Sequence, residues 1–392
     1  MTLIAAERWL HAQQRKALGA SVSAAAATGT EESWAQDSHD WRVDLLRQAK
    51  MDSNAPDWHL LTEAELWEPI ELASEGEHPF QSELATALQS ISAAHSALCP
   101  IPLQPTIAGA LPTHERHAAV YAPSGSTARV IILDWGLLSA LRESANLASE
   151  ALGPEGGALP EFLGALDARA AVRRDPLYAF CWGHVLAALG DPARRPPFRS
   201  FKSQHRALQV RRRVEPATLL DALVLVVLAH EAAHVALNHS ASPSLGTAAR
   251  LQFEREADGL AIAYLMQVGM HSEHPDDAGS LYLFAFGFLM SLMTQLASCD
   301  RVLVDAGKRI ASPSTHPPGT ERLIIGLETL ERLIAARPHA GVQFVNALAA
   351  GNALGNEMYN AAWGLTKDLL LRGGEAAPAS PASPDDARLC YL

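Results

Sequence analysis

The chain has 392 residues, 48% of them hydrophobic and 19% charged, with a formal net charge of −12. This length allows two domains or one large domain, and the composition is that of a globular protein, which excludes a disordered or collagen-like chain. The acidic balance argues against a nucleic-acid partner. The four cysteines lie far apart and form no CxxC pair, so we expect reduced thiols rather than a zinc ribbon or a disulfide framework.

Residues 1–115 are predicted to form a mainly helical N-terminal region of unknown role. Near its start, polar side chains such as Glu7 and Arg8 interrupt the apolar run that a signal peptide needs, so an amphipathic helix is expected there. The segment from Gln81 to Leu98 carries apolar residues at helical spacing. Because the sequence shows no export signal, we expect a cytoplasmic protein.

A β pattern begins at residue 117. Two runs rich in β-forming residues flank the turn sequence PSGS at 123–126, which predicts a hairpin over residues 117–134. We expect a helix to follow from Trp135.

Residues 154–216 are rich in Pro, Gly and Arg and are predicted to form a loop-rich insertion. Between Arg173 and Arg213 the chain carries ten Lys or Arg against two Asp. A solvated surface accounts for this basic excess, and a docking surface for an acidic partner is the alternative.

The most clearly predicted helix covers residues 217–239. Its run from Leu219 to Ala229 is apolar apart from Asp221, so this helix should lie inside the domain rather than on its surface. A second helix is predicted at about 248–268. A third apolar stretch, Leu281 to Leu296, approaches the length of a membrane span but contains polar side chains. We expect a buried core helix there, with a membrane or re-entrant segment as the alternative.

The end of the chain is predicted in two parts. Residues 341–374 should form a C-terminal helical segment, whereas residues 375–392 have the composition of a disordered tail. Taken together, these elements predict a mainly α fold with a small β-hairpin or sheet, in the α+β class.

The string His230-Glu231-Ala232-Ala233-His234 lies on the apolar helix. On a helix, residues four apart share a face, so both imidazoles point into the same space, as two ligands of one zinc ion must. Glu231 lies beside the first ligand, where its carboxylate can reach a zinc-activated water. Burying two His and one Glu on such a helix without a metal would cost several kcal/mol in order of magnitude, about what unpaired polar groups cost.

A catalytic zinc ion needs a third protein ligand. His239 is poorly placed, because on a continuous helix it would project about 140° away from the second ligand histidine. We expect it to be a helix-end or loop histidine instead. In the next helix Glu254 and Asp258 are four residues apart and share a face, whereas Glu256 points about 200° away from Glu254. One of these two carboxylates can bind zinc while the other accepts the second N–H of a ligand histidine.

The strings HEAAHVALNH and FEREADGLAIAYL resemble the gluzincins of the HtpX and CAAX-prenyl-protease superfamily, which includes BepA-like peptidases and carries HExxH followed by ExxAD. The twenty positions between His234 and Glu254 are also similar to the compact spacing of the phage-exclusion peptidase Lit. The resemblance implies a zincin-like metallopeptidase core over about 116–340, built on an active-site helix and a glutamate helix. It also implies that Glu254 is the third zinc ligand and that Asp258 orients a ligand histidine.

A third string, His316-Pro317-Pro318, precedes Arg322. Similar enzymes have an HP…R element over the active site, which implies that His316 and Arg322 contact the zinc-activated water or the substrate carbonyl. A Pro-rich turn that caps the following helix is the alternative interpretation.

These features predict a zinc-dependent endopeptidase with one zinc ion per chain. Zinc lowers the pKa of a bound water to about 7 and polarises the scissile carbonyl, and Glu231 acts as the general base. The strand Arg129–Leu133 could bind an extended protein or peptide substrate by strand addition. One alternative is a membrane-associated protease, if Leu281 to Leu296 spans a bilayer. The other is a non-catalytic zinc-binding module, against which Glu231 argues because a structural zinc site needs no base.

Overall fold

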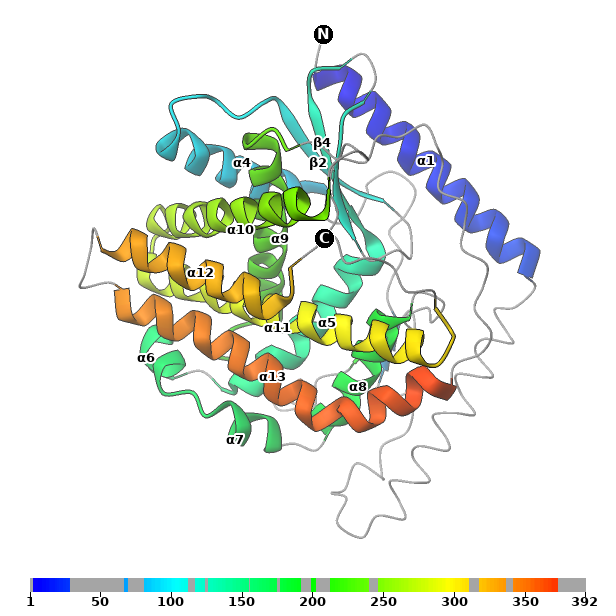
Figure 1. Cartoon of the computed structure of the whole chain (residues 1–392), viewed down its shortest axis with the longest axis vertical. Helices are drawn as coiled ribbons and strands as arrows, with labels where there is room; N and C mark the ends of the chain where they lie inside the picture. The colour runs from blue at the N-terminus through cyan, green and yellow to red at the C-terminus, as the bar shows by residue number, and fades with distance from the viewer. Residues whose placement is uncertain are drawn as a thin grey trace.

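The structure, a computed structural model, is mostly helical with small β-sheets (Figure 1). The predicted fold class, mainly α with a small β component, is therefore confirmed. The structure describes residues 3–28, 67–69, 81–111, 117–123, 126–154, 156–174, 177–191, 199–201, 212–239, 246–309, 317–335 and 341–372.

The larger sheet has three strands, β2 (Thr106–Leu111), β3 (Ala118–Tyr121) and β4 (Arg129–Asp134). β4 lies in the middle, parallel to β2 and antiparallel to β3. The β3–β4 pair confirms the predicted hairpin, although residues 124–125 of its turn lie outside the described residues. The smaller sheet pairs β1 (Trp67–Pro69) with β5 (Arg199–Phe201).

The position of β4 between β2 and β3 leaves this strand no free edge for a substrate. Ile131 of β4 pairs with Ala108 on one side and with Val120 on the other, so both edges of this strand are already hydrogen-bonded. The prediction that Arg129–Leu133 binds a substrate by strand addition is therefore wrong, because addition needs a free edge. The outer strands of this sheet are β2 and β3.

The two faces of the sheet bury different surfaces, because side chains alternate along a strand. On β4, Ile131 and Leu133 join the main helical core, whereas Val130 and Ile132 belong to a smaller cluster with α1 (Leu3–Thr28). The sheet is thus covered on both faces.

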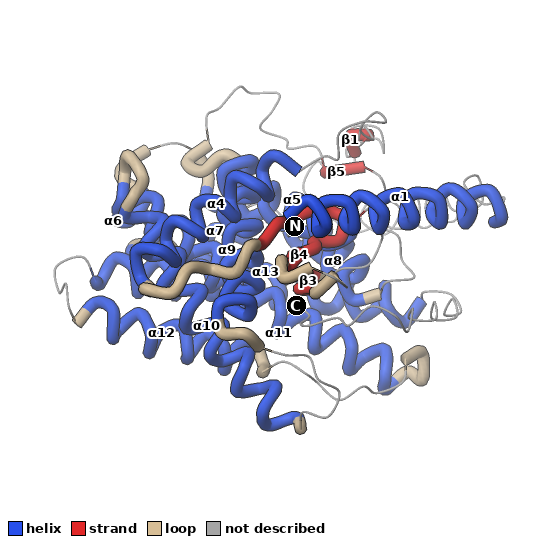
Figure 2. The backbone as a smooth tube through the Cα atoms, turned by 90° about the horizontal axis from the view of Figure 1, so that it is seen from above, coloured by secondary structure: helices blue, strands red, loops and turns tan. Residues whose placement is uncertain are grey.

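Helix α1 is held on the sheet by apolar and polar contacts. Leu10 is buried, and the rings of Trp9 and Tyr121 lie 5.4 Å apart. The amide of Gln14 donates to the carbonyl of Ala110 at 3.0 Å. The far end of α1 extends past the body of the molecule (Figure 2).

The remaining helices form the main core. They are α4 (Gln81–Leu98), α5 (Trp135–Leu152), α6 (Leu159–Gly164), α7 (Ala168–Arg173), α8 (Leu177–Gly190), α9 (Pro216–Ala236), α10 (Thr247–Met270), α11 (Pro275–Asp305), α12 (Gly319–Ile334) and α13 (Gly341–Arg372). Helices α9, α10, α11 and α13 correspond to the four predicted for the C-terminal half of the chain. The tail at 375–392 lies outside the described residues.

Helix α9 is the central helix of this core. Pro216 lies in its first turn, where a missing N–H costs nothing. Every residue from Ala222 to Val235 is buried, and α4, α5, α10 and α11 pack around it. The prediction of an interior helix is confirmed.

Helix α11 is also a core helix. Its polar Gln295 is satisfied internally, because its amide nitrogen donates to Ser291 Oγ at 2.9 Å and its amide oxygen accepts from Trp182 Nε1 at 3.0 Å. By length and composition α9 and α11 could each cross a membrane, but 83% and 72% of their most apolar stretches are buried inside the protein. This burial supports the core-helix interpretation of Leu281 to Leu296.

The prediction of a loop-rich insertion over residues 154–216 is wrong for its first half. Helices α6, α7 and α8 occupy much of residues 159–190, and Trp182 of α8 is fully buried in the core. Pro160 is one of the residues whose type favoured a loop. It lies in the first turn of α6, however, where proline is compatible with a helix. Parts of the basic segment, including residues 192–198 and 202–211, lie outside the described residues.

Candidate metal centre

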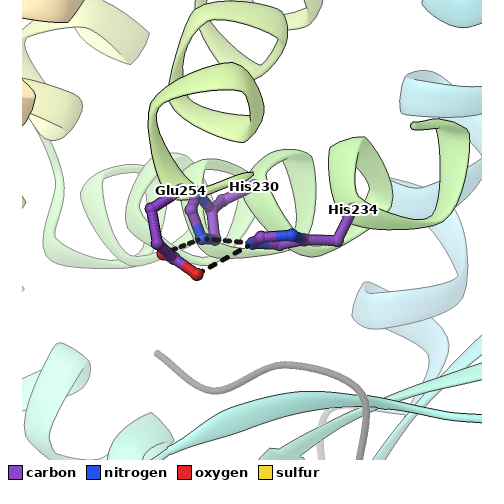
Figure 3. Close-up of side chains that lie close together, drawn as sticks. All are labelled: His230, His234 and Glu254. Carbon is purple, nitrogen blue, oxygen red and sulfur yellow. Dashed lines mark hydrogen bonds and ion pairs between the residues drawn. The ribbon is translucent and has the colours of Figure 1, made fainter. Parts of the chain in front are cut away.

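Helices α9 and α10 cross so that His230, His234 and Glu254 point into one space (Figure 3). The Nε2 atoms of the two histidines are 3.1 Å apart. Glu254 Oε2 lies 3.3 Å from His230 Nε2, and Glu254 Oε1 lies 3.5 Å from His234 Nε2. All three side chains are buried.

These distances fit a zinc ion. In a tetrahedral site with ligand bonds of about 2.0–2.2 Å, neighbouring ligand atoms are separated by roughly 3.3 Å. Two neutral imidazoles and one carboxylate are also the donor set that leaves a fourth position for water at a catalytic zinc. The residues brought together here therefore suit the metal that the sequence implies.

Glu231 follows His230 directly on α9. It is fully buried, and neither of its carboxylate oxygens has a hydrogen-bond partner among the described residues. Burial raises the pKa of Glu231 to about 7. Because buried polar groups are nearly always hydrogen-bonded, such a carboxylate indicates a group that binds water or a ligand.

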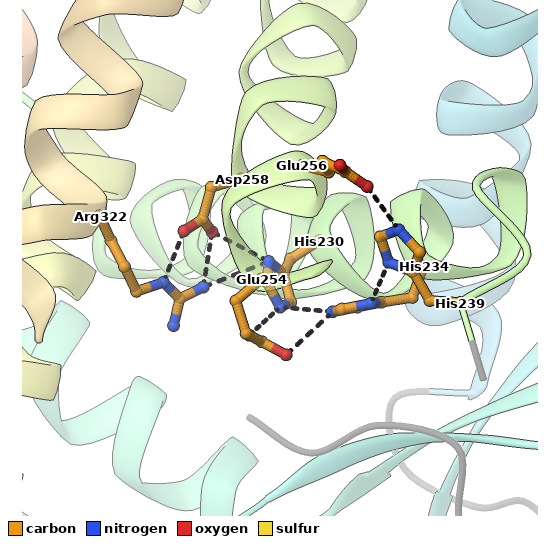
Figure 4. Close-up of polar contacts among 7 residues, drawn as sticks. All are labelled: His230, His234, His239, Glu254, Glu256, Asp258 and Arg322. Atoms are coloured by element: carbon orange, nitrogen blue, oxygen red, sulfur yellow. Dashed lines mark hydrogen bonds and ion pairs between the residues drawn. The ribbon is translucent and has the colours of Figure 1, made fainter. Parts of the chain in front are cut away.

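On the other side of His230, Asp258 accepts a hydrogen bond. The distance from His230 Nδ1 to Asp258 Oδ1 is 3.0 Å (Figure 4). Arg322 of α12 donates to both oxygens of this carboxylate, at 2.8 Å from Nε and 2.6 Å from Nη2. Burial alone would raise the pKa of Asp258, but the Arg322 charge and the two sets of hydrogen bonds hold it below its ordinary value. Asp258 thus lies where the resemblance implies an orienting aspartate.

Arg322 has a further donor. Its Nη1 atom is buried and has no hydrogen-bond partner within the part of the chain that the structure describes. Figure 4 shows this nitrogen pointing away from Asp258. His316 lies outside the described residues, so the structure does not place it. Pro318 is the N-cap of α12 and its carbonyl accepts from the backbone N–H of Arg322 at 3.1 Å, as a capping turn would.

His234 has a partner that the sequence analysis missed. His239 Nδ1 lies 2.9 Å from His234 Nδ1, and His239 Nε2 lies 3.1 Å from Glu256 Oε2 (Figure 4). The prediction of a helix-end or loop histidine is confirmed, because α9 ends at Ala236 and His239 lies beyond its end. The chain turns back there and brings the ring of His239 to His234, which the projection along a continuous helix did not predict. The signal was available in the sequence, since Asn is a common residue for ending a helix.

The pKa values of His230 and His234 shift in opposite directions. Burial and the Arg322 charge lower the pKa of His230, but hydrogen bonds to Asp258 and Glu254 outweigh them and raise it to about 9. Burial lowers the pKa of His234 well below its ordinary value. A metal ion would replace the proton that these carboxylates favour on His230.

Comparison with known protein families gives one match. The family model of Peptidase U49 matches residues 202–342, a segment that contains His230, His234, Glu254 and Arg322. This match supports a peptidase, and hence a hydrolase that acts on proteins or peptides, but it is not specific to the HtpX, CAAX-prenyl-protease and BepA-like superfamily. Neither the search of curated proteins nor that of solved structures finds a match.

Proposed function

We propose that this protein is a zinc-dependent endopeptidase, with His230, His234 and Glu254 as the zinc ligands. The observation that carries the proposal is the set of three buried ligand atoms, separated by 3.1–3.5 Å. Beside them lies the buried carboxylate of Glu231, which has no hydrogen-bond partner among the described residues. The match to a peptidase family over the same residues supports it.

The residues of the site divide the chemistry among them. Zinc, when bound, lowers the pKa of a water molecule to about 7 and polarises the scissile carbonyl. Glu231 takes a proton from the attacking water and passes it to the leaving amine. Its raised pKa in the metal-free protein, about 7, suits a group that both accepts and returns a proton near neutral pH.

Arg322 and His316 are candidates for contacts to the substrate. The Nη1 of Arg322, which has no partner in the described part of the chain, is a buried cationic donor held beside the ligands by Asp258. A donor of this kind stabilises negative charge as it develops on a carbonyl oxygen. The resemblance to HP…R enzymes is the support for His316.

We also propose that the enzyme works in the cytoplasm, with membrane association as the alternative. The burial of α9 and α11 supports a protein without a membrane span. A non-catalytic zinc module is less consistent with the site. The carboxylate of Glu231, which no described residue hydrogen-bonds, has no use in a structural metal centre.

The proposal is tested by protease activity with a matched pair of variants. Wild-type protein and Glu231→Gln, both zinc-loaded, are incubated with a cell lysate, and new N-termini are identified by mass spectrometry. We expect new termini with wild type and a loss of at least about a hundredfold in Glu231→Gln, because general-base catalysis contributes roughly 10²–10⁴ in rate.

The control is Glu273→Gln, the same chemical change at an exposed position between α10 and α11. It should cleave as wild type does. Equal cleavage by wild type and Glu231→Gln would refute the role of Glu231 as general base. An absence of cleavage by zinc-loaded wild type would count against a peptidase with this mechanism.

A further inference from the structure

The buried ring of His239 lies between a proposed zinc ligand and a partly exposed carboxylate, connecting His234 to Glu256. We propose that His239 is a positioning residue, which orients the ring of His234 for zinc and is itself anchored by Glu256. This inference rests on the zinc site proposed above. It adds a role for His239, which lies outside the HExxH motif, and for Glu256, which occupies a variable position of ExxAD.

The backbone at the end of α9 brings His239 to this place. Asn238 has a φ of 51°, in the left-handed region that Asn adopts more readily than most residues. The N–H of His239 then donates to the carbonyl of His234 at 3.0 Å, and the N–H of Asn238 donates to that of Val235 at 3.1 Å. These two bonds form a Schellman motif. The turn therefore fixes the backbone of His239 directly to that of the ligand whose side chain it contacts.

The hydrogen-bond donors and acceptors form a consistent chain. His234 faces the other two ligands through Nε2, so with zinc on Nε2 its Nδ1 carries the proton and donates to Nδ1 of His239. His239 is then protonated on Nε2 and donates to Glu256 Oε2, at 3.1 Å. Both histidines are neutral in this arrangement, and each buried nitrogen has a partner. Such a bond from the non-ligating nitrogen fixes the tautomer and ring orientation of a metal ligand.

Packing fixes the plane of the His239 ring as well. The ring stacks on Phe253 of α10, with centroids 4.1 Å apart and an interplanar angle of 9°. The side chain of His239 is 3% exposed, whereas that of Glu256 is 43% exposed. Water can therefore replace Glu256 as acceptor, but it has little access to His234. We expect His239 to contribute more than Glu256 does.

The two ligand histidines are thus held by different means. His230 is oriented by Asp258, whose charge is balanced by a buried arginine. His234 is oriented by a neutral imidazole with an anchor at the surface. Loss of the His234 partner should therefore affect zinc binding without leaving a buried charge unpaired, which makes the effect measurable in a folded protein.

The test is zinc affinity, measured by competition with a chromogenic chelator in the full-length protein. His239→Phe keeps a ring that can stack on Phe253 but removes the acceptor for His234, and should weaken zinc binding about ten- to a hundredfold. His239→Gln offers an amide oxygen as acceptor and should recover at least part of this loss. Glu256→Ala should weaken zinc binding by only a few-fold, because water can accept the hydrogen bond from His239 Nε2 in place of the exposed Glu256.

Two further measurements separate positioning from folding. The thermal midpoint of the zinc-free protein should be similar for wild type and His239→Phe, and the visible spectrum of the cobalt-substituted protein should change in His239→Phe.

If His239→Phe does not fold, the exposed Asn238 provides the test. Asn238→Val disfavours the left-handed turn and should lower zinc affinity, whereas Asn238→Gly should stay nearer to wild type.

The outcomes distinguish this inference from the proposed function. Wild-type protein that binds no zinc would refute the zinc site itself. If wild type binds zinc and His239→Phe binds it equally well, the positioning role of His239 is refuted while the zinc site stands. If His239→Gln is as weak as His239→Phe, the hydrogen bond to His234 is not the cause, and the inference is likewise overturned.

Discussion

Asp258 is the residue on which the His230 side of the site depends. Its carboxylate accepts from His230 and from both Nε and Nη2 of Arg322, and all of these side chains are buried. One carboxylate therefore serves two purposes. It holds the ring of His230, a proposed zinc ligand, and it neutralises a buried guanidinium.

The two purposes can be separated by mutation. Asp258→Ala leaves Arg322 buried and unpaired, and should destabilise the zinc-free protein by about 3–5 kcal/mol. It should also weaken zinc binding roughly ten- to a hundredfold. The double variant Asp258→Ala/Arg322→Met removes both charges, so it should regain most of the stability but not the affinity. Urea unfolding and chelator competition measure the two quantities. A double variant with wild-type zinc affinity would contradict the orienting role of Asp258.

For single residues, the sequence predicted which side chains share a helix face, but it did not predict their contacts with the rest of the chain. The helical spacing of His230 with His234, and of Glu254 with Asp258, was sufficient to place these side chains on shared faces. The contacts of Arg322 and His239 depend on how segments outside these two helices pack against the site. Arg322 arrives from a helix 64 residues along the chain from Asp258, and His239 returns because Asn238 leaves the helical conformation. Neither fact follows from periodicity.

Among the elements, α11 and α13 show how close packing depends on glycine. A Cβ atom on Gly287 of α11 would lie 2.1 Å from the carbonyl oxygen of Leu348. One on Gly351 of α13 would lie 2.0 Å from that of Phe284. Backbone atoms cannot yield as a flexible side chain can, so a larger residue at either position must push the helices apart.

Two alanine substitutions test this packing. Gly287→Ala should destabilise the protein by about 1–3 kcal/mol or more, because overpacking shifts the backbone. Gly364→Ala, on an exposed part of α13 where a Cβ meets nothing within 4 Å, is the matched control. It should stabilise the protein by roughly 0.5–1 kcal/mol, since alanine is the better helix former. If the two substitutions change the free energy of unfolding in urea equally, the contact between Gly287 and Leu348 is not tight.

Elements with a strong local pattern were predictable, and those defined by distant partners were not. The mostly apolar α9 and the hairpin of β3 and β4 follow from local sequence. β2 was missed because TIAGAL, at 106–111, has weak strand signals and pairs in parallel with a strand more than twenty residues away. The same pairing closes the second edge of β4, which is why strand addition at β4 could not be judged from the hairpin alone.

At the scale of the whole molecule, the two described helices that are long and apolar enough to cross a membrane, α9 and α11, lie mostly in the interior. α9 carries two of the proposed zinc ligands, and α11 packs against both α9 and α13. The full-length chain expressed without detergent should therefore be recovered in the soluble fraction. Recovery in membranes that resists extraction with alkaline carbonate would favour the membrane-associated alternative.

The central claim is that α9 and α10 together bind one zinc ion. The most direct test is the metal content of purified protein, measured by mass spectrometry after expression with added zinc. We predict about one zinc per chain in wild type and little in Glu254→Ala, because a site with two histidines binds zinc far more weakly than a site with three ligands. Wild-type protein without zinc, or Glu254→Ala with as much zinc as wild type, would contradict the account.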